Sequence, residues 1–161
     1  MREAATALAV RSANDVAVVV AEGVAGSEEA FARQMNARAR AIGMSRTHFV
    51  NASGLPDEGQ ISTARDMALL ALQLRTRFPA YQNFFTLKEF RFNGRRYEAT
   101  NKLLGKVPGV DGLKTGYIRA SGFHLVATAQ RGNKRLIAVV MGGETGRARD
   151  ARAEQLLETW F

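Results

Sequence analysis

The sequence predicts a single α+β domain, and the order of its hydrophobic patterns is the main reason. In the first half of the chain apolar residues recur at helical spacing, whereas from residue 86 onwards they follow the pattern of strands. A last helical stretch closes the chain, an order that is typical of an α+β fold. The 161 residues, 46% of them apolar, suffice for one hydrophobic core, and no repeat or linker divides them.

Two helical pieces are predicted at the start of the chain, with a polar break between them. Residues 2–10 form the first piece, and the apolar run 16–21 belongs to the second. The break contains Ser12-Ala13-Asn14, whose serine and asparagine side chains compete for nearby backbone groups and favour caps and turns. A polar break in so apolar a stretch suggests a functional reason for it.

Two further helices carry clear end signals. Ser27, followed by two glutamates, is a typical N-cap, and Gly43 ends that helix. Ser62 or Thr63 caps the next helix, which Pro79 ends. The buried faces are expected to carry Phe31, Met35 and Ile42 in the first of these helices and Met67, Leu70, Ala71 and Leu74 in the second.

A β-hairpin and a meander are predicted in the second half. Asn93-Gly94 suits a two-residue type I′ turn, so residues 86–92 and 95–100 are expected to pair. Three more strands are expected to form an antiparallel meander, at residues 113–118, 122–130 and 134–141.

The last strand and the closing helix are the most apolar elements of this half. Residues 136–141 are apolar on both faces, which predicts a central position in the sheet. The helix 148–161 is expected to bury the Leu156-Leu157 pair together with Trp160 and Phe161.

The charge balance favours anionic partners, since 23 Lys and Arg against 15 Asp and Glu give a formal net charge of +8. The basic residues are spread over every segment, which speaks against a nucleic-acid-binding domain. The chain has no cysteine, and its only histidines, His48 and His124, have no metal-ligand spacing, so we expect no metal site. His124 is expected to face a neighbouring strand.

Two short motifs carry the chemistry of the sequence. Ser12-Ala13-Asn14 lies at the helix break, and Lys114-Thr115-Gly116 begins a strand just after Gly112. In the second motif the lysine supplies a cation, the threonine a hydroxyl donor, and the glycine a bare edge against which a substrate backbone can lie. Such an edge suits a peptide that ends in a carboxylate. Taken singly, the motifs are more typical of a helix cap and an ordinary strand; their occurrence together favours a functional site.

With these motifs the sequence resembles the penicillin-recognising serine D,D-peptidases, specifically the D-alanyl-D-alanine carboxypeptidase family, peptidase S11. RSANDVAVVVAE is similar to the family's Ser-x-Asn segment and GVDGLKTGYIRASGFHLVATAQR to its Lys-Thr-Gly segment. The resemblance covers nearly the whole chain. The family's Ser-x-x-Lys motif, which holds the nucleophile, is absent, because no serine or threonine is followed by lysine three positions later.

The resemblance implies a penicillin-binding-protein or β-lactamase-like transpeptidase fold, an antiparallel sheet packed with helices. This fold would be incomplete, with the N-terminal strands and the nucleophile helix missing, so residues 1–161 would form one partial D,D-peptidase catalytic domain. Because the residues that would cover 136–141 are then absent, we expect an open sheet edge or an exposed apolar face there. Association through that face is predicted, by dimerisation, strand exchange or pairing with a separate N-terminal segment.

The resemblance also implies catalytic roles for three residues. Ser12 would relay a proton to the leaving amine, and Asn14 would hold the side-chain amide of the acyl group. Lys114 would supply positive potential near Ser12 and the substrate carboxylate. The acyl transfer uses protein groups and no cofactor, and its nucleophilic serine and basic lysine belong to the absent Ser-x-x-Lys.

Four further residues would bind the substrate. Thr115 would donate a hydrogen bond to its carboxylate, Gly116 would give its backbone room, and the Tyr117 N–H would be one oxyanion donor. Arg149 matches a family arginine that is placed towards the same carboxylate. By itself, Arg149 is as typical of a surface charge at a helix end.

The implied function is removal of the terminal D-alanine from peptidoglycan stem peptides that end in D-Ala-D-Ala, in the bacterial periplasm or at the cell surface. β-Lactams would inhibit the complete enzyme. Without nucleophile and base, this chain is expected to be inactive alone, and a non-catalytic module that binds the same peptides is the alternative. A β-lactamase-like hydrolase is a weaker alternative, because the motif is Ser-Ala-Asn and not Ser-Asp-Asn. No nucleic-acid partner is expected, and Glu3 lies where an export signal would be basic or apolar.

Overall fold

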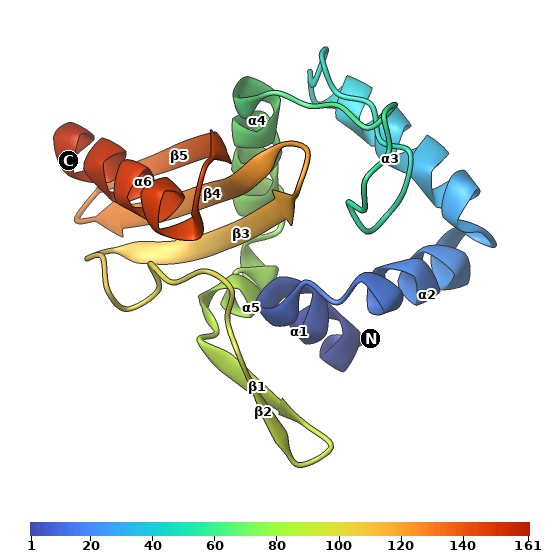
Figure 1. The fold of residues 1–161 in the computed structure, drawn as a ribbon, viewed down its shortest axis with the longest axis horizontal. Coiled ribbons are helices and arrows are strands. Elements are labelled where there is room, and N and C mark those ends of the chain that lie inside the picture. The colour runs from blue at the N-terminus through green and yellow to red at the C-terminus, as the bar shows by residue number, and fades with distance from the viewer.

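The computed structural model describes residues 1–161 and shows helices in the first half, then a β-hairpin, a three-stranded sheet and a closing helix (Figure 1). The helices are α1 (Arg2–Arg11), α2 (Asn14–Ala25), α3 (Glu28–Ala41), α4 (Ala64–Arg77), α5 (Asn83–Thr86) and α6 (Gly146–Trp160), with a 3₁₀ turn η1 at Pro79–Tyr81. The strands are β1 (Glu89–Phe92), β2 (Arg95–Glu98), β3 (Val110–Ile118), β4 (Gly122–Arg131) and β5 (Lys134–Gly143). The predicted α+β class is confirmed.

The larger sheet has the antiparallel order β3-β4-β5, so β4 is its central strand. Helix α6 covers one face of the sheet and α4 the other (Figure 1). On the α6 side, Leu125 and Ala127 of β4 belong to one hydrophobic cluster with Ala153 and Leu157 of α6. The side chain of Thr128 points to the opposite face, where it binds α4. This helix–sheet–helix packing forms the core that supports β3.

Strand β5 lies at an edge of the sheet, so the predicted central position of residues 136–141 is wrong. Its residues are apolar on both faces because both faces are covered. Ala138 belongs to the cluster beneath α6, while its neighbour Ile137 pairs with Thr128 on the side of α4. A run that is apolar on both faces therefore indicates two covered faces and not a partner strand on each edge. The edge of β5 is open, as expected, but the sheet face is not.

The helix ends follow the predicted capping signals. The Ser27 hydroxyl accepts a hydrogen bond from the Ala30 N–H at 3.1 Å, and the Thr63 hydroxyl accepts one from the Asp66 N–H at 3.2 Å. Gly43 follows α3 with a φ of +86°, a left-handed conformation that suits glycine. None of the helices is both long and apolar enough to span a membrane.

The buried face of α3 differs from the prediction. Its most buried residues are Ala32, Asn36 and Ala39, whereas the predicted Phe31, Met35 and Ile42 are only partly covered. Asn36 bonds both the N–H and the carbonyl of Phe49 at 2.7 Å. Close contact with a loop thus determines which face of α3 is covered. In α4, Ala71 is buried, and the predicted Met67, Leu70 and Leu74 are partly so.

The hairpin forms at the predicted turn. Asn93 and Gly94 have φ values of +47° and +72°, the two left-handed residues of a type I′ turn, and Phe92 pairs with Arg95. Strand β1 begins at Glu89, later than predicted, because Thr86 is the last residue of α5 and Leu87 and Lys88 connect this helix to the strand.

The residues of α6 that pack against the sheet are spaced four positions apart. Arg149, Ala153 and Leu157 are buried, and Phe161 continues this row, partly buried and stacked against the Arg131 guanidinium. Trp160 is 66% exposed, so the prediction that it belongs to the core is wrong. It lies on the neighbouring side of the last turn, which points to solvent.

Candidate active site

The two sequence motifs meet in the structure through one direct contact. The Lys114 ammonium donates a hydrogen bond to the Ser12 hydroxyl at 2.8 Å across 102 residues of sequence. The same ammonium also donates to the Thr115 carbonyl at 2.9 Å. The serine of the helix break and the lysine of β3 therefore form one polar group at the junction of helices and sheet.

The helix break places Ser12 at this junction. Helix α1 ends at Ser12, which adopts the left-handed conformation with φ +60° and donates its N–H to the Leu8 carbonyl. Helix α2 restarts at Asn14, so the chain turns sharply between two helices. Just before the turn, Val10 is buried with 1% of its surface exposed. This buried anchor fixes the end of α1 and with it the position of the Ser12 hydroxyl.

Burial lowers the pKa of Lys114 to about 8. Its hydrogen-bond partners are the neutral Ser12 hydroxyl and the Thr115 carbonyl, and no carboxylate forms an ion pair with it. A buried cation without a counter-ion attracts anions strongly. The site is therefore suited to binding a negatively charged group.

All seven predicted site residues line one cavity of about 900 Å³. They are Ser12, Asn14, Lys114, Thr115, Gly116, Tyr117 and Arg149. The cavity lies along β3, which is the edge strand of the sheet on this side. A peptide that enters it can run beside an unpaired strand edge.

Arg149 is buried, which excludes the surface-charge interpretation. Its side chain is 7% exposed, and it donates to the His124 carbonyl at 3.2 Å and pairs with Asp150 at 2.8 Å. Arg149 comes from the first turn of α6, whose N-cap is the Thr145 hydroxyl. The first turn of α6 thus brings a second cation to the cavity that contains Lys114.

His124 faces a neighbouring strand, as expected. Its Nδ1 accepts a hydrogen bond from the Gly142 N–H at 3.1 Å, and its Nε2 lies 2.9 Å from the Ser121 hydroxyl. Burial and the nearby Arg149 lower the pKa of His124. The imidazole therefore links β4 to β5 beside the cavity.

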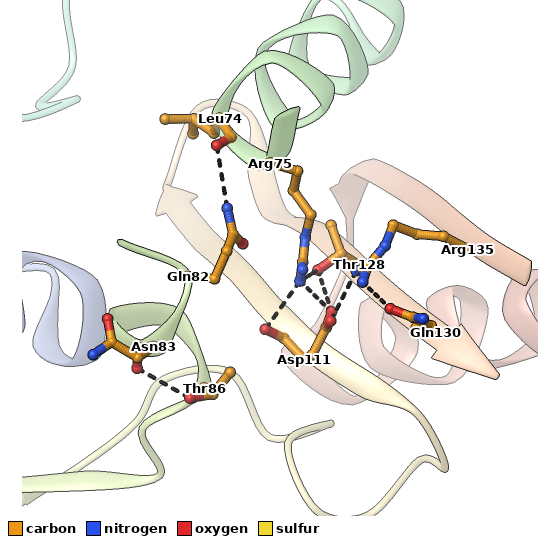
Figure 2. A network of polar contacts seen from close by, with 9 residues as sticks. All are labelled: Leu74, Arg75, Gln82, Asn83, Thr86, Asp111, Thr128, Gln130 and Arg135. Atoms are coloured by element: carbon orange, nitrogen blue, oxygen red, sulfur yellow. Dashed lines mark hydrogen bonds and ion pairs between the residues drawn. The ribbon is translucent and has the colours of Figure 1, made fainter. Parts of the chain in front are cut away.

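A polar network behind β3 is a feature that sequence reasoning missed (Figure 2). The Arg75 guanidinium of α4 donates to the Asp111 carboxylate and to the Thr128 hydroxyl, and Thr128 donates to Asp111 at 2.7 Å. Arg135 of β5 pairs with the other Asp111 oxygen at 2.9 Å. Asp111 comes three residues before Lys114, so the network secures the start of the strand that presents the lysine. The only signal in the sequence is an acidic residue directly before Gly112.

Gly112 lies where a Cβ would be tightly packed against α5 and against Thr128 of this network. A Cβ at this position would lie 3.2 Å from the Phe85 Cβ and 3.3 Å from the Thr128 hydroxyl. Its φ of +156° also disfavours other residues. Glycine before the Lys-Thr-Gly motif thus lets β3 pack closely against α5 and β4.

A second cavity, of about 1070 Å³, adjoins the first and shares Ser12, Asn14, Ser53 and Lys114 with it. Hydrophobic side chains from α1, α2, α4 and the segment around α5 form most of its lining, among them Leu8, Ala17, Val20, Leu74, Phe78 and Phe84. The polar group of Ser12 and Lys114 therefore lies between a polar cavity and an apolar one. No three His, Asp or Glu side chains gather as metal ligands.

A comparison of the sequence with known protein families identifies one family that has both motifs. The peptidase S11 family, described as D-alanyl-D-alanine carboxypeptidase, matches residues 1–145. The chain belongs to the peptidase S11 family. This match confirms the family that the two motifs predicted.

Curated peptidase S11 relatives are much longer than the chain. It is 43% identical over 152 residues to the D-alanyl-D-alanine carboxypeptidase DacA of Escherichia coli, covering 94% of this chain and 38% of the relative. It is 38% identical to DacF of Bacillus subtilis over 167 residues, covering 100% of this chain and 42% of that protein. The chain thus spans about 40% of the length of these relatives and matches part of a catalytic domain.

Solved structures of penicillin-binding proteins share its fold. Penicillin binding protein 5 from Haemophilus influenzae superposes with a TM-score of 0.94 at 35% identity, over 98% of this chain and 46% of the other. Penicillin-Binding Protein D2 from Listeria monocytogenes, in its ampicillin-bound form, gives a TM-score of 0.90 at 36% identity, over 98% and 65%. The predicted transpeptidase-like fold is confirmed, in part of its full extent.

Proposed function

We propose that this chain is the substrate-binding part of a serine-type D-alanyl-D-alanine carboxypeptidase site and binds peptidoglycan stem peptides that end in D-Ala-D-Ala. The contact between Lys114 and Ser12 carries the proposal, since it joins the two family motifs in one cavity that also contains Thr115 and Arg149. In the complete site the terminal D-alanine leaves as an acyl-enzyme forms, and water then releases the shortened peptide.

Three residues would act on the substrate around the bond that is cleaved. Ser12 passes a proton to the leaving amine, for which its hydrogen bond to Lys114 is suitably placed. Lys114 supplies the positive potential that draws in the carboxylate. Asn14, at the start of α2 and on the same cavity, holds the side-chain amide of the acyl group.

The remaining residues hold the substrate along β3. Thr115 and Arg149 bind the terminal carboxylate, and Gly116 leaves room for the peptide backbone against the strand edge. The Tyr117 N–H is one oxyanion donor, an interaction that typically lowers a barrier by about 3 kcal/mol.

The nucleophile must come from elsewhere, because the sequence has no Ser-x-x-Lys. The chain alone then binds the peptide but has no route to an acyl-enzyme. A complementing segment that carries Ser-x-x-Lys is the partner we propose, seated along the open edge of β5 and in the apolar cavity beside Ser12. A homo-oligomer formed through the same edge is the other outcome, and light scattering at increasing concentration separates the two. A compact monomer at high concentration argues against the oligomer.

The proposed setting is the periplasm or cell surface of a bacterium, where stem peptides are found. β-Lactams are the expected inhibitors of the complete enzyme, in keeping with the ampicillin-bound relative. The matched curated relatives named above are bacterial proteins. The net charge of +8 would steer the protein towards anionic wall polymers.

Two measurements on the isolated chain test the proposal. Titration with diacetyl-Lys-D-Ala-D-Ala is expected to saturate without release of D-alanine, and intact-protein mass spectrometry after benzylpenicillin treatment is expected to show no adduct. Absence of saturable binding would overturn the proposal. A mass increase equal to the mass of benzylpenicillin would show that a residue of this chain is acylated, and Ser12 would be the first candidate.

A non-catalytic peptide-binding module is the second candidate, which the absence of Ser-x-x-Lys favours. Both candidates bind the peptide, so binding does not separate them. Addition of the corresponding N-terminal segment of a peptidase S11 relative does, because only a carboxypeptidase part then releases D-alanine.

A further inference from the structure

The hydroxyl of Thr115 is already engaged in the structure. It donates its single proton to the Thr100 hydroxyl at 2.7 Å. The Thr100 hydroxyl accepts this bond, and its own proton has no protein acceptor. The residue proposed to hold the substrate carboxylate is therefore one half of a threonine pair.

Thr100 lies between the two motifs and is held there by its backbone. Its N–H donates to the carbonyl of Val10 at 3.2 Å, two residues before Ser12. The preceding Ala99 is buried and bonds the Lys88 carbonyl at 2.7 Å. Thr100 also lines the cavity of about 900 Å³ that contains the site.

Charge determines what happens to the pair when a peptide carboxylate enters. The cations of Lys114 and Arg149 draw the carboxylate to this cavity. A carboxylate oxygen is a stronger acceptor than a hydroxyl oxygen, so the Thr115 proton turns towards it. The Thr115 oxygen then needs a donor, and the Thr100 hydroxyl 2.7 Å away supplies one. Such a chain of two hydroxyls strengthens the outer bond by polarisation.

On the basis of the proposed function, we infer that Thr100 is a positioning residue that makes the site specific for a free C-terminal carboxylate. In the empty site Thr115 donates to Thr100, and in the occupied site Thr100 donates to Thr115 while Thr115 donates to the carboxylate. A peptide with a C-terminal amide gains little from this reversal, because its neutral oxygen is a weaker acceptor.

The test compares two peptides on three variants of the chain by NMR titration. The peptides are diacetyl-Lys-D-Ala-D-Ala and its C-terminal amide, and the variants are Thr100→Val, Thr100→Ser and, as a control remote from the site, Thr76→Val. Valine keeps the shape of threonine without the hydroxyl. We expect Thr100→Val to weaken binding of the acid about tenfold and of the amide less than twofold, because the Thr115 hydroxyl then donates to the carboxylate without a hydrogen bond from Thr100 behind it. Thr100→Ser keeps the hydroxyl and should therefore keep the wild-type preference for the acid. Thr76→Val should leave both affinities unchanged.

The outcomes separate this inference from the function on which it rests. An unchanged ratio of acid to amide affinity in Thr100→Val, or an equal loss for both peptides, overturns the role of Thr100 and leaves the proposed function standing. A wild-type chain that gives a well-dispersed spectrum but binds neither peptide overturns the proposed function and this inference together.

Discussion

The two motifs of the site lie on parts of the molecule that are packed very differently. Lys114 lies on a sheet that α4 and α6 cover on both sides and that contains the main hydrophobic cluster. Asn14 lies at the start of a helical arm, formed by α2 and α3, which extends away from the sheet (Figure 1). In this arm Val19 and Val24 are 67% and 53% exposed. The site thus joins a well-packed half to a sparsely packed one.

This difference indicates which half sets the geometry. Strand β3 is held by β4, by the core and by the Asp111 network, so Lys114 has a defined position before any ligand arrives. Ser12 depends on the end of α1, on buried Val10 and on the bond to Lys114 itself. The sheet therefore holds Lys114 through more contacts than the helices use to hold Ser12.

The largest expected effect is a core truncation in the sheet. Leu125 is 0% exposed in the main cluster, so Leu125→Ala should lower the free energy of unfolding by about 2–5 kcal/mol. Val19→Ala in the helical arm should change it by less than about 0.5 kcal/mol, because the side chain is already in solvent. Urea unfolding measures both. Similar losses for the two variants would contradict the contrast between the halves.

Removal of the buried cation should affect binding more than folding. Lys114→Met should weaken binding of diacetyl-Lys-D-Ala-D-Ala at least about tenfold, because the buried positive charge that attracts the carboxylate is lost. Stability should stay the same or rise, since a buried charge without a counter-ion is removed. Calorimetric titration and thermal unfolding measure the two quantities, with exposed Lys134→Met as the control. A large loss of stability with intact binding would reverse the assignment.

The pH dependence follows from the pKa of Lys114, which is about 8 in the folded chain against 10.5 in a free lysine. Peptide affinity should fall as the pH rises through about 8, because Lys114 loses its charge. Stability should move the other way. Between about pH 8 and 10.5 the unfolded chain binds more protons than the folded one, so the free energy of unfolding rises over this window. Both trends should be absent in Lys114→Met, and their persistence there would assign them to another group.

The smallest effects come from two matched helix caps. The Ser27 hydroxyl caps α3 in the arm, and the Thr145 hydroxyl caps α6 against the sheet. Each cap replaced by alanine should cost about 1 kcal/mol. Hydrogen exchange should show the loss from Ser27→Ala only within the helical arm, whereas Thr145→Ala should speed exchange across the sheet as well. Equal spread in both variants would show that the molecule unfolds as one unit.

Local features of the fold were predictable from the sequence. Capping residues, the Asn93-Gly94 turn and the change from helical to strand spacing act over a few residues, so a single sequence is enough to read them. The two site motifs were predictable for a related reason. Each is a short segment whose residue types suit one chemistry, and the family match confirms the family they indicated.

Tertiary structure alone decided which elements became neighbours. The apolar run 136–141 indicates that both faces of β5 are covered, but it does not indicate that β5 is an edge strand. Strands pair through backbone hydrogen bonds, so the polarity of the side chains does not depend on the number of paired neighbours. The exposure of Trp160 and the burial of Arg149 depend on how α6 lies on the sheet. Thr100 belongs to no motif, and it reaches the site only because the chain path brings its hydroxyl to Thr115 and its backbone to α1. Residue spacing over a few positions determines the local helices, turns and strands, whereas contacts between distant segments form only when the core packs.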